Sequence, residues 1–582
     1  MNNPNAFDSL RPDMMDELDE EAQIQRAIAL SLGLVEEEPT RQIIAEHSRI
    51  PLEDTNPVPT SKQEPSRDSA PSSSSNFIMS RAQMERERLE RVAKRKREEN
   101  TGNNGVKIPK TSHGSLLDQD SDHGALHTKA AQSQKAALAA DSNRELKSKM
   151  SGSRVNEEFK EGKLALTYVE GHPLHDKLRF EDIVDKTNLR RALFSAFQLD
   201  AVWLKAYLPP DIPVCLVVHP EQKSDKGTVK VQGRITLVEP PMQKYGYGTM
   251  HAKLIALQYP TFLRIAICSG NLVSYDWNLL ENVVYVQDFP SFPVPGGVDS
   301  SEFSRDLLDF VTAMCVPSTF LAMFSDYDFS KARVQLVCSK PGTHSGADLE
   351  KYGHTRLAHL VRKCGAQCDL EDGLAVECQT SSLGSLNRSY LLELYRSFCG
   401  QPLSESRTHK LESPELPPVA IIYPTLQTVE TSSLGPQNAG TICFRNEYYQ
   451  NPQFPRGCLY DCKSRRKGCL MHTKFILAGF LEEKRISDHR RLGGWFYCGK
   501  DGLLGVLALT APCLFRGVQS RSRNRQLQLR INNWELGCFV PLYSTCKTGG
   551  GQDWFVQHGV PVPYVRPPDA YGSGDKPWLQ TS

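Results

Sequence analysis

Two histidine–lysine pairs in this chain share the same spacing and the same kind of apolar surroundings. They are His251 with Lys253 in the run 250–257, and His472 with Lys474 in the run 470–477. Side chains two residues apart on a strand point to the same face. Each pair should therefore present an imidazole and an ammonium group together. If the two runs meet in the fold, two imidazoles and two ammonium groups surround one anion.

That combination of groups suits phosphoryl chemistry. One imidazole can attack phosphorus and form a covalent phosphohistidine, while the other donates a proton to the leaving oxygen. The second imidazole, now neutral, can then deprotonate the water that cleaves the intermediate. The ammonium groups can hold the non-bridging oxygens and offset the charge of the transition state. These steps need neither a metal nor a cofactor, and we expect none.

A zinc site is the alternative use of the second pair's surroundings. Cys458, Cys462, Cys469 and His472 have spacings that zinc ligands can adopt. One histidine cannot easily bind zinc and transfer a proton as well. Reduced cysteines beside a basic loop account for the same pattern, so we predict no metal.

Alternating strand and helix patterns begin near residue 157 and are expected to position the two pairs. The expected strands lie at 214–218, 263–268, 334–338, 419–423 and 495–498, and the expected helices at 187–197, 305–315 and 349–363. Mixed elements around a repeated motif predict an α/β fold of two similar halves, 157–340 and 341–582. Each half would be a mixed sheet flanked by helices, with the active site at the interface.

Composition narrows the setting further. The chain has 582 residues and a formal net charge of +1, so nucleic-acid binding would have to come from a local groove. Its 16 cysteines lack the dense spacing of a small secreted scaffold, and no signal peptide precedes them, which favours a reducing intracellular compartment. The apolar run 503–515 is too short to span a bilayer, so no membrane anchor is expected.

An amphipathic helix is expected near the N-terminus, at 13–38. Its stripe follows i, i+3, i+4, i+7 spacing and consists of Ile24, Ala27, Ile28 and Ser31. With its acidic flanks, this stripe resembles a ubiquitin-interacting motif, in which these four residues would contact ubiquitin. The alternative is a solvated helix that docks on the chain's own catalytic domain.

Residues 39–156 are predicted to be disordered, because a segment of Ser, Pro, Lys, Glu and Gln with few aromatics cannot bury enough apolar surface. Within this linker, Lys94-Arg95-Lys96-Arg97 reads as a nuclear import signal, so we expect the protein in the nucleus. A charged helical face is the alternative, since glutamates interleave with the arginines just before these four residues.

Further short motifs accompany the two pairs. They are Ser269-Gly270-Asn271-Leu272 with Asp276-Trp277, Gln379 to Leu386, Trp534-Glu535-Leu536-Gly537, Pro561 to Tyr564 and Tyr571-Gly572-Ser573. Together they resemble the tyrosyl-DNA phosphodiesterase branch of the phospholipase D superfamily, over residues 157–578. The superfamily's usual signature has an Asp where this chain has Gln258 and Gly479, and that branch lacks it too. The resemblance implies two phospholipase D-like halves.

The resemblance also implies catalytic roles. His251 matches the nucleophile and His472 the general acid and base. The implied ligands of the phosphate oxygens are Lys253, Lys474 and Asn271. Glu535 matches a carboxylate that orients a catalytic imidazole and fixes its tautomer.

Substrate contacts are implied in the same way. A loop that binds the DNA backbone is matched by Ser382, Leu383, Gly384 and Ser385. Tyr247 matches an aromatic residue that stacks on a base of single-stranded substrate. Asn282 stands where the family often has Gln, in a positioning role.

The segment 500–528 departs from the family pattern. Gly502 stands where the family has the asparagine that supplies the second half's amide ligand. Either a translated intron or a shifted reading frame produced the segment, or the enzyme has diverged. A divergent enzyme would use Asn524, Asn532 or Asn533 instead. Losing one such donor costs on the order of 100-fold in rate.

The resemblance implies a DNA repair phosphodiesterase that hydrolyses the 3′-phosphotyrosyl bond of stalled topoisomerase I complexes. The expected partners are DNA with 3′-blocked ends, single- or double-stranded, a topoisomerase I-derived peptide and ubiquitin, with the chain acting as a monomer. One rival is an inactive scaffold that binds DNA ends and ubiquitin. Another is a phospholipid-cleaving relative, which the absence of the paired Asp residues disfavours.

Overall fold

The computed structural model describes residues 158–243, 248–294, 297–371, 374–402, 415–487, 490–499, 527–544 and 554–580, all of which belong to one compact unit. The predicted ubiquitin-binding helix at 13–38, the linker at 39–156, Tyr247 and nearly all of 500–528 lie outside these residues. Over the described ranges, no helix is long and apolar enough to cross a membrane.

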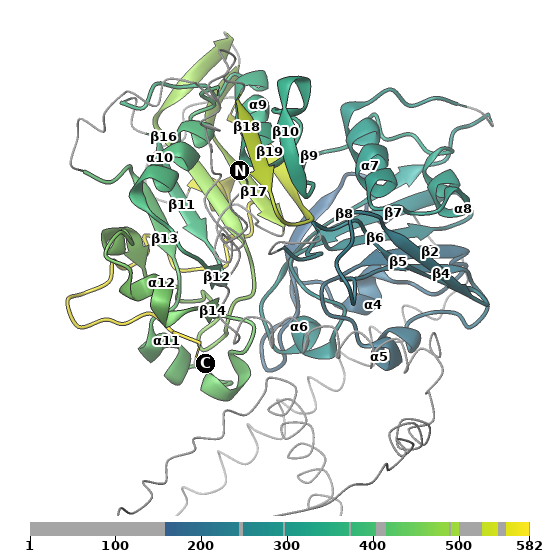
Figure 1. Ribbon diagram of the computed structural model, residues 1–582, viewed down its shortest axis with the longest axis horizontal. Coiled ribbons are helices and arrows are strands. Elements are labelled where there is room, and N and C mark those ends of the chain that lie inside the picture. Colours follow the sequence, from purple (N-terminus) through teal and green to yellow (C-terminus); the bar gives the residue numbers. More distant parts are fainter. Residues whose placement is uncertain are drawn as a thin grey trace, which may run out of the picture. The chain divides into compact units, whose positions relative to one another are not determined.

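The first sheet has eight strands in the order β1-β8-β7-β6-β2-β3-β5-β4 (Figure 1). Its strands are β1 (Lys163–Leu166), β2 (Arg191–Ser195), β3 (Val214–Val217), β4 (Thr228–Gln232), β5 (Ile235–Glu239), β6 (Leu254–Gln258), β7 (Phe262–Cys268) and β8 (Val283–Pro290). β2 pairs parallel with β3, and β3 with β5, whereas β6 and β7 pair antiparallel with their neighbours.

The second sheet has seven strands in the order β15-β13-β11-β16-β17-β19-β9. Its strands are β9 (Gln335–Ser339), β11 (Ala375–Gln379), β13 (Val419–Ile422), β15 (Leu459–Tyr460), β16 (Phe475–Ser487), β17 (Arg490–Gly499) and β19 (Glu535–Ser544). β9 precedes the predicted boundary at residue 340, yet it pairs antiparallel with β19 in this second sheet.

The two sheets repeat one arrangement of six strands. The order β8-β7-β6-β2-β3-β5 in the first corresponds to β19-β17-β16-β11-β13-β15 in the second, with the same parallel and antiparallel pairings. The fold is thus mixed α/β with two similar halves, as the repeated motif predicted. β6 and β16, each of which follows a histidine–lysine pair, occupy equivalent places.

Two short sheets and ten α-helices complete the described part of the chain. The short sheets join β10 (Gly342–Ser345) to β18 (Gln528–Ile531), and β12 (Ser382–Leu383) to β14 (Cys443–Phe444). The helices are α4 (Phe180–Ile183), α5 (Ala201–Lys205), α6 (Ser274–Asn278), α7 (Glu302–Ala313), α8 (Ser318–Leu321), α9 (Gly353–Lys363), α10 (Arg388–Phe398), α11 (Leu426–Glu430), α12 (Asn446–Gln450) and α13 (Trp554–Gln557).

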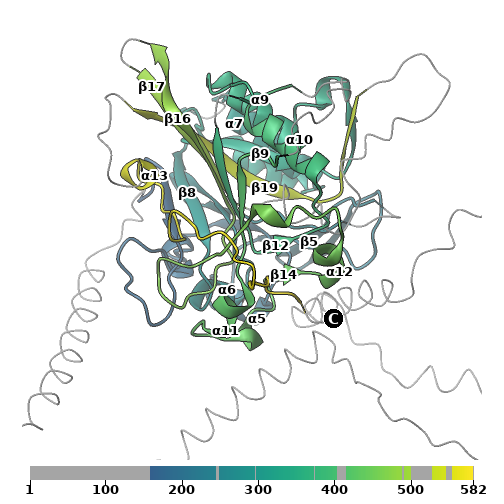
Figure 2. The same cartoon turned by 90° about the vertical axis from the view of Figure 1, so that its left-hand side faces the viewer.

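Side-chain caps fix where the longer helices begin. The Ser301 hydroxyl accepts a hydrogen bond from the Ser304 N–H (3.2 Å) at the start of α7, and the Asn387 side chain accepts one from the Tyr390 N–H (2.9 Å) at the start of α10. α9 and α10 contact each other beside the second sheet (Figure 2). Their apolar sides share one buried cluster with strands of that sheet.

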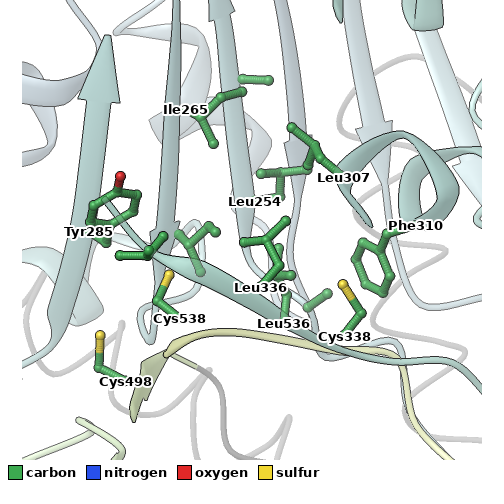
Figure 3. Packing of buried hydrophobic residues seen from close by; sticks show 14 of the residues in the cluster. Leu254, Ile265, Tyr285, Leu307, Phe310, Leu336, Cys338, Cys498, Leu536 and Cys538 are labelled. Atoms are coloured by element: carbon green, nitrogen blue, oxygen red, sulfur yellow. The ribbon is translucent and has the colours of Figure 1, made fainter. Parts of the chain in front are cut away.

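Within the described residues, one of the two core clusters lies between the two sheets. Figure 3 shows Leu254, Ile265 and Tyr285 from the first sheet facing a layer of residues from the second sheet and from α7. That layer consists of Leu336, Cys338, Cys498, Leu536, Cys538, Leu307 and Phe310. Because this cluster is continuous across the halves, burial of apolar surface fixes how one half sits on the other.

The helix predicted at 187–197 is wrong. Residues 191–195 form β2, a central strand between β3 and β6. Ala192, Leu193 and Phe194 are all fully buried, as an inner strand covered on both faces requires. A short apolar run of this kind does not distinguish a buried strand from a buried helix by periodicity.

Candidate active site

Both histidine–lysine pairs lie just before a strand and not within it. β6 begins at Leu254 and β16 at Phe475, one residue after each lysine. The residue before each histidine pairs across the halves instead: Met250 bridges Trp534, and Met471 bridges Glu281. The chain stays extended here, but its backbone partners come from the opposite half.

The two lysines occupy equivalent positions. Lys253 Nζ donates to the backbone oxygen of His251 (3.1 Å), and Lys474 Nζ donates to that of His472 (2.5 Å). Both lysine side chains are almost completely buried. Two buried cations favour the binding of an anionic ligand beside them.

The imidazole of His251 faces a carboxylate from the other half. Its Nδ1 lies 3.4 Å from Oε1 of Glu535, the first residue of β19. The ring of Phe197 meets the His251 ring edge-on, with centroids 4.8 Å apart. A distance of 3.4 Å is long for a hydrogen bond, and such contacts commonly tighten when substrate binds.

The imidazole of His472 has the reciprocal arrangement. Its Nδ1 lies 3.4 Å from Oδ1 of Asp276, on α6 of the first half. The other oxygen of Asp276 accepts the backbone N–H of Asn271 (2.6 Å). Burial alone would raise the pKa of Asp276, but His472, the Asn271 N–H and the charge of Lys474 together outweigh it, and the net pKa is lowered.

Each histidine is therefore oriented by a carboxylate of the opposite half. We call these the His251–Glu535 pair and the His472–Asp276 pair. In each, Nδ1 faces the carboxylate, so the proton belongs on Nδ1 and the lone pair on Nε2. Nε2 is the atom that can attack or exchange a proton.

The two pairs share close neighbours. The charges of Lys253 and Asp276 both act on the buried thiol of Cys268, and the charge of Lys474 acts on Asp276. These charge effects connect Lys253 of the first half and Lys474 of the second half to Asp276 and its neighbour Cys268. The expectation that both pairs bind one common anion stays a prediction.

Asn271 and Asn282 have different surroundings. The Asn271 side-chain oxygen accepts from the Gln198 N–H (3.3 Å), which turns its NH₂ group away from that backbone. Asn282 is fully buried; its NH₂ donates to the Asp276 carbonyl (2.7 Å) and its oxygen accepts from the Ser269 hydroxyl (2.7 Å). Both ends of the Asn282 amide are used within the fold, so it supports the Asp276 segment and not a ligand directly.

The loop matched to DNA binding begins at β12. Ser382 and Leu383 pair parallel with β14, Gly384 is buried, and Ser385 is exposed. The preceding Ser381 is fully buried, and among the described residues its hydroxyl has no hydrogen-bond partner. A buried hydroxyl without a partner beside a loop of this kind is a candidate phosphate donor that the sequence reasoning missed.

Two of the four candidate zinc ligands lie close to other side chains. Cys469 Sγ lies 3.2 Å from Nε2 of His172, while His472 faces Asp276. Within the described ranges, no group of three or more His, Cys, Asp or Glu side chains could hold a metal ion.

Comparison with known proteins identifies the family. The sequence profile of the family described as tyrosyl-DNA phosphodiesterase matches residues 163–572. The chain belongs to the tyrosyl-DNA phosphodiesterase family.

Individual relatives agree with this assignment. Tyrosyl-DNA phosphodiesterase 1 of Arabidopsis thaliana is 26% identical over 431 residues, covering 66% of this chain and 68% of the relative. The Drosophila melanogaster protein of the same name is 25% identical over 443 residues, covering 70% and 72%. A crystal structure of yeast tyrosyl-DNA phosphodiesterase superposes with a TM-score of 0.51 at 18% identity, covering 72% of this chain and 100% of that one. At that identity the structural match supports the fold.

Asn532 and Asn533 were considered as substitutes for the family's second amide ligand. Asn533 instead hydrogen-bonds to Thr249 and Glu535, beside the nucleophile candidate His251. The backbone oxygen of Asn532 lies against Gly248, where a Cβ would approach to 2.3 Å. Both residues thus support the His251 side of this tyrosyl-DNA phosphodiesterase family site, while Asn524 lies outside the described residues.

Asp276 is the positioning residue that sequence reasoning did not assign. Asp276 belongs to the short family motif Asp276-Trp277, whereas the resemblance implies an orienting role for Glu535 alone. The signal available was an acid five residues after Asn271, in the first turn of a short helix. Its pairing with His472, about 200 residues away in sequence, follows only from the contact between the halves.

Proposed function

We propose that this member of the tyrosyl-DNA phosphodiesterase family hydrolyses the 3′-phosphotyrosyl bond that joins DNA to a topoisomerase I-derived peptide. The proposal includes a covalent phosphohistidine intermediate. The observation that carries it is the reciprocal pairing of two imidazoles with carboxylates of the opposite halves, with a buried lysine two residues after each histidine.

In the first step, His251 Nε2 attacks phosphorus while the bond to the tyrosine oxygen breaks. His472, protonated, gives its Nε2 proton to that leaving oxygen. His251 is the better nucleophile candidate because its side chain is 17% exposed, against 4% for His472. Glu535 offsets the positive charge that develops on the His251 ring.

In the second step, neutral His472 deprotonates a water molecule that attacks the same phosphorus. The phosphorus–nitrogen bond breaks, leaving a 3′-phosphate on the DNA and returning both histidines to their starting forms. Lys253, Lys474 and Asn271 bind the non-bridging oxygens during both steps.

Substrate DNA is held beyond the reacting phosphate. Ser382, Leu383, Gly384 and Ser385 contact the backbone, and the buried Ser381 hydroxyl adds a donor at the start of this loop. Tyr247 stacks on a base of single-stranded substrate.

Recruitment and location belong to the same proposal. Ile24, Ala27, Ile28 and Ser31 bind ubiquitin and bring the protein, as a monomer in the nucleus, to topoisomerase complexes marked for degradation. Ala27→Arg should abolish capture of the full chain by immobilised mono-ubiquitin, and undiminished capture would contradict this role.

The catalytic proposal is tested with a 3′-phosphotyrosyl oligonucleotide in single turnover. Wild type should release tyrosine, and His251→Ala should lose roughly 10⁴-fold or more in rate. His472→Ala should accumulate a DNA adduct on His251, detectable by mass spectrometry, because the water-activating base is missing. Tight binding without cleavage by wild type would favour the inactive scaffold instead.

A further inference from the structure

The side chain of Asn533 lies at the junction between the nucleophile segment and the carboxylate that orients it. Asn533 is 3% exposed and sits between β18 and β19. Its amide oxygen accepts from the Thr249 N–H (2.8 Å). Its NH₂ donates to the Thr249 hydroxyl (2.7 Å) and to Oε1 of Glu535 (3.1 Å).

The orientation of this amide follows from its partners. The Thr249 N–H can only donate, so the atom facing it must be the amide oxygen. The NH₂ group is then the end that meets Thr249 Oγ1 and Glu535. A carboxylate that accepts from an NH₂ group is stabilised in its ionised form.

The backbone ties the same two segments together. The Trp534 N–H donates to the Thr249 carbonyl (3.1 Å), and the His251 N–H donates to the Trp534 carbonyl (2.9 Å). Asn533 and Glu535 therefore flank Trp534, the residue whose backbone pairs with the segment that carries His251. Glu535 Oε1 is the atom that faces His251 Nδ1, and it is also the atom that Asn533 holds.

The His472–Asp276 pair receives its support differently. There, a backbone N–H, that of Asn271, holds the carboxylate oxygen that does not face the imidazole. A backbone donor is present whatever the side chain, whereas the donor on the His251 side depends on residue 533 being able to supply an NH₂.

We propose that Asn533 is a positioning residue that acts through Glu535 on His251. It holds Oε1 of Glu535 next to Nδ1 of His251. His251 thereby keeps its proton on Nδ1 and its attacking lone pair on Nε2. This inference rests on the proposed function, in which His251 is the nucleophile.

A double-mutant cycle distinguishes this positioning role from a purely structural role, in which Asn533 only stabilises the contact between the two halves. In the full-length protein, Asn533→Ala should lower kcat on the 3′-phosphotyrosyl oligonucleotide by roughly 10-fold, as loss of an orienting partner does, with little change in KM. In a Glu535→Gln background the same substitution should change kcat less than about 2-fold, because the group it acts through is already gone. Equal losses in both backgrounds, or wild-type activity of Asn533→Ala, would overturn the inference.

The pH profile gives a second readout. Asn533→Asp keeps the acceptor for the Thr249 N–H but places a second carboxylate against Glu535. Its kcat relative to wild type should rise as pH falls, because protonation of the introduced carboxyl group restores a donor to Glu535. A ratio that stays constant with pH would contradict the inference.

Two controls keep the outcomes distinct. Asn387→Ala removes an asparagine cap from α10 and should lower thermal stability without the loss in kcat expected of Asn533→Ala. Wild type must release tyrosine, and His472→Ala must accumulate the His251 adduct. If either result is absent, the proposed function has failed; if both are obtained while Asn533→Ala matches wild type, only the role of Asn533 has failed.

Discussion

The His251–Glu535 pair and the His472–Asp276 pair have the same 3.4 Å separation but different surroundings. The His251 side chain is 17% exposed and its carboxylate is held by the amide of Asn533, whereas His472 is 4% exposed and its carboxylate is held by a backbone N–H. The more open imidazole suits direct attack on phosphorus. The enclosed imidazole suits repeated proton transfer, which needs a fixed pKa and a fixed tautomer.

The difference shows how a duplicated fold can supply two chemical roles. Both halves provide the same six-strand arrangement and the same histidine–lysine spacing. The carboxylates come from different points along corresponding connections: Asp276 lies on a helix between β7 and β8, whereas Glu535 is the first residue of β19, which follows β17 in the sheet. In the proposed mechanism, different surroundings of the same motif separate the nucleophile from the acid.

The largest effect should come from the more enclosed pair. Asp276→Asn should lower kcat by roughly 10³-fold, because an amide of the same shape can favour the wrong tautomer of His472. Glu535→Gln should cost less, roughly 10²-fold, since water can reach His251. Single-turnover rates with the 3′-phosphotyrosyl oligonucleotide measure the loss in each variant. A larger loss in Glu535→Gln than in Asp276→Asn would contradict the expected order.

The stability of the fold should depend on the ion pair between Arg466 and Glu281, which lies next to the His472 backbone. Arg466 pairs with the fully buried Glu281, whose backbone oxygen accepts from the His472 N–H (2.8 Å). Arg466→Met leaves that carboxylate buried without its cation and should lower the free energy of unfolding by about 3 kcal/mol. Chemical denaturation measures the loss, and adding Glu281→Gln to the same protein should restore part of it. No recovery in the double variant would contradict this cause.

The His251 segment should instead be sensitive to acid. His219 Nδ1 accepts from the Met250 N–H (3.1 Å), and burial lowers the pKa of His219 to about 3. An unfolded histidine has a pKa of about 6.5. The stabilisation that the neutral, buried His219 gives to the fold is therefore complete above that pH, and it is lost as the pH falls toward the pKa of His219 in the folded protein. At about pH 5 the loss is roughly 2 kcal/mol.

His219→Asn tests that sensitivity, because its side-chain oxygen can replace Nδ1 as the acceptor. The variant should show a shallower decline in the free energy of unfolding between about pH 6.5 and 5 than wild type. Part of the decline should remain in both proteins, since burial also lowers the pKa of His354, to about 4. Identical declines would exclude His219 as the source.

Several structural features were accessible from local sequence. The strands at 214–218, 263–268 and 419–423 and the helix at 305–315 were predicted within a few residues, because each has a clear apolar pattern. The strand at 191–195 was mistaken for a helix, since full burial on both faces removes the alternation that marks a strand. Chain position alone does not show that Asn533 hydrogen-bonds to Thr249 and Glu535, next to His251 in the fold.

The sequence by itself determined which reactive groups this protein carries and which family it belongs to. Two histidine–lysine pairs in matching apolar runs specify two imidazoles and two cations, and the accompanying motifs specify the family. Only the tertiary structure decided which carboxylate orients which histidine. Those contacts join residues hundreds of positions apart, and they exist because burial of the shared apolar core fixes one sheet against the other.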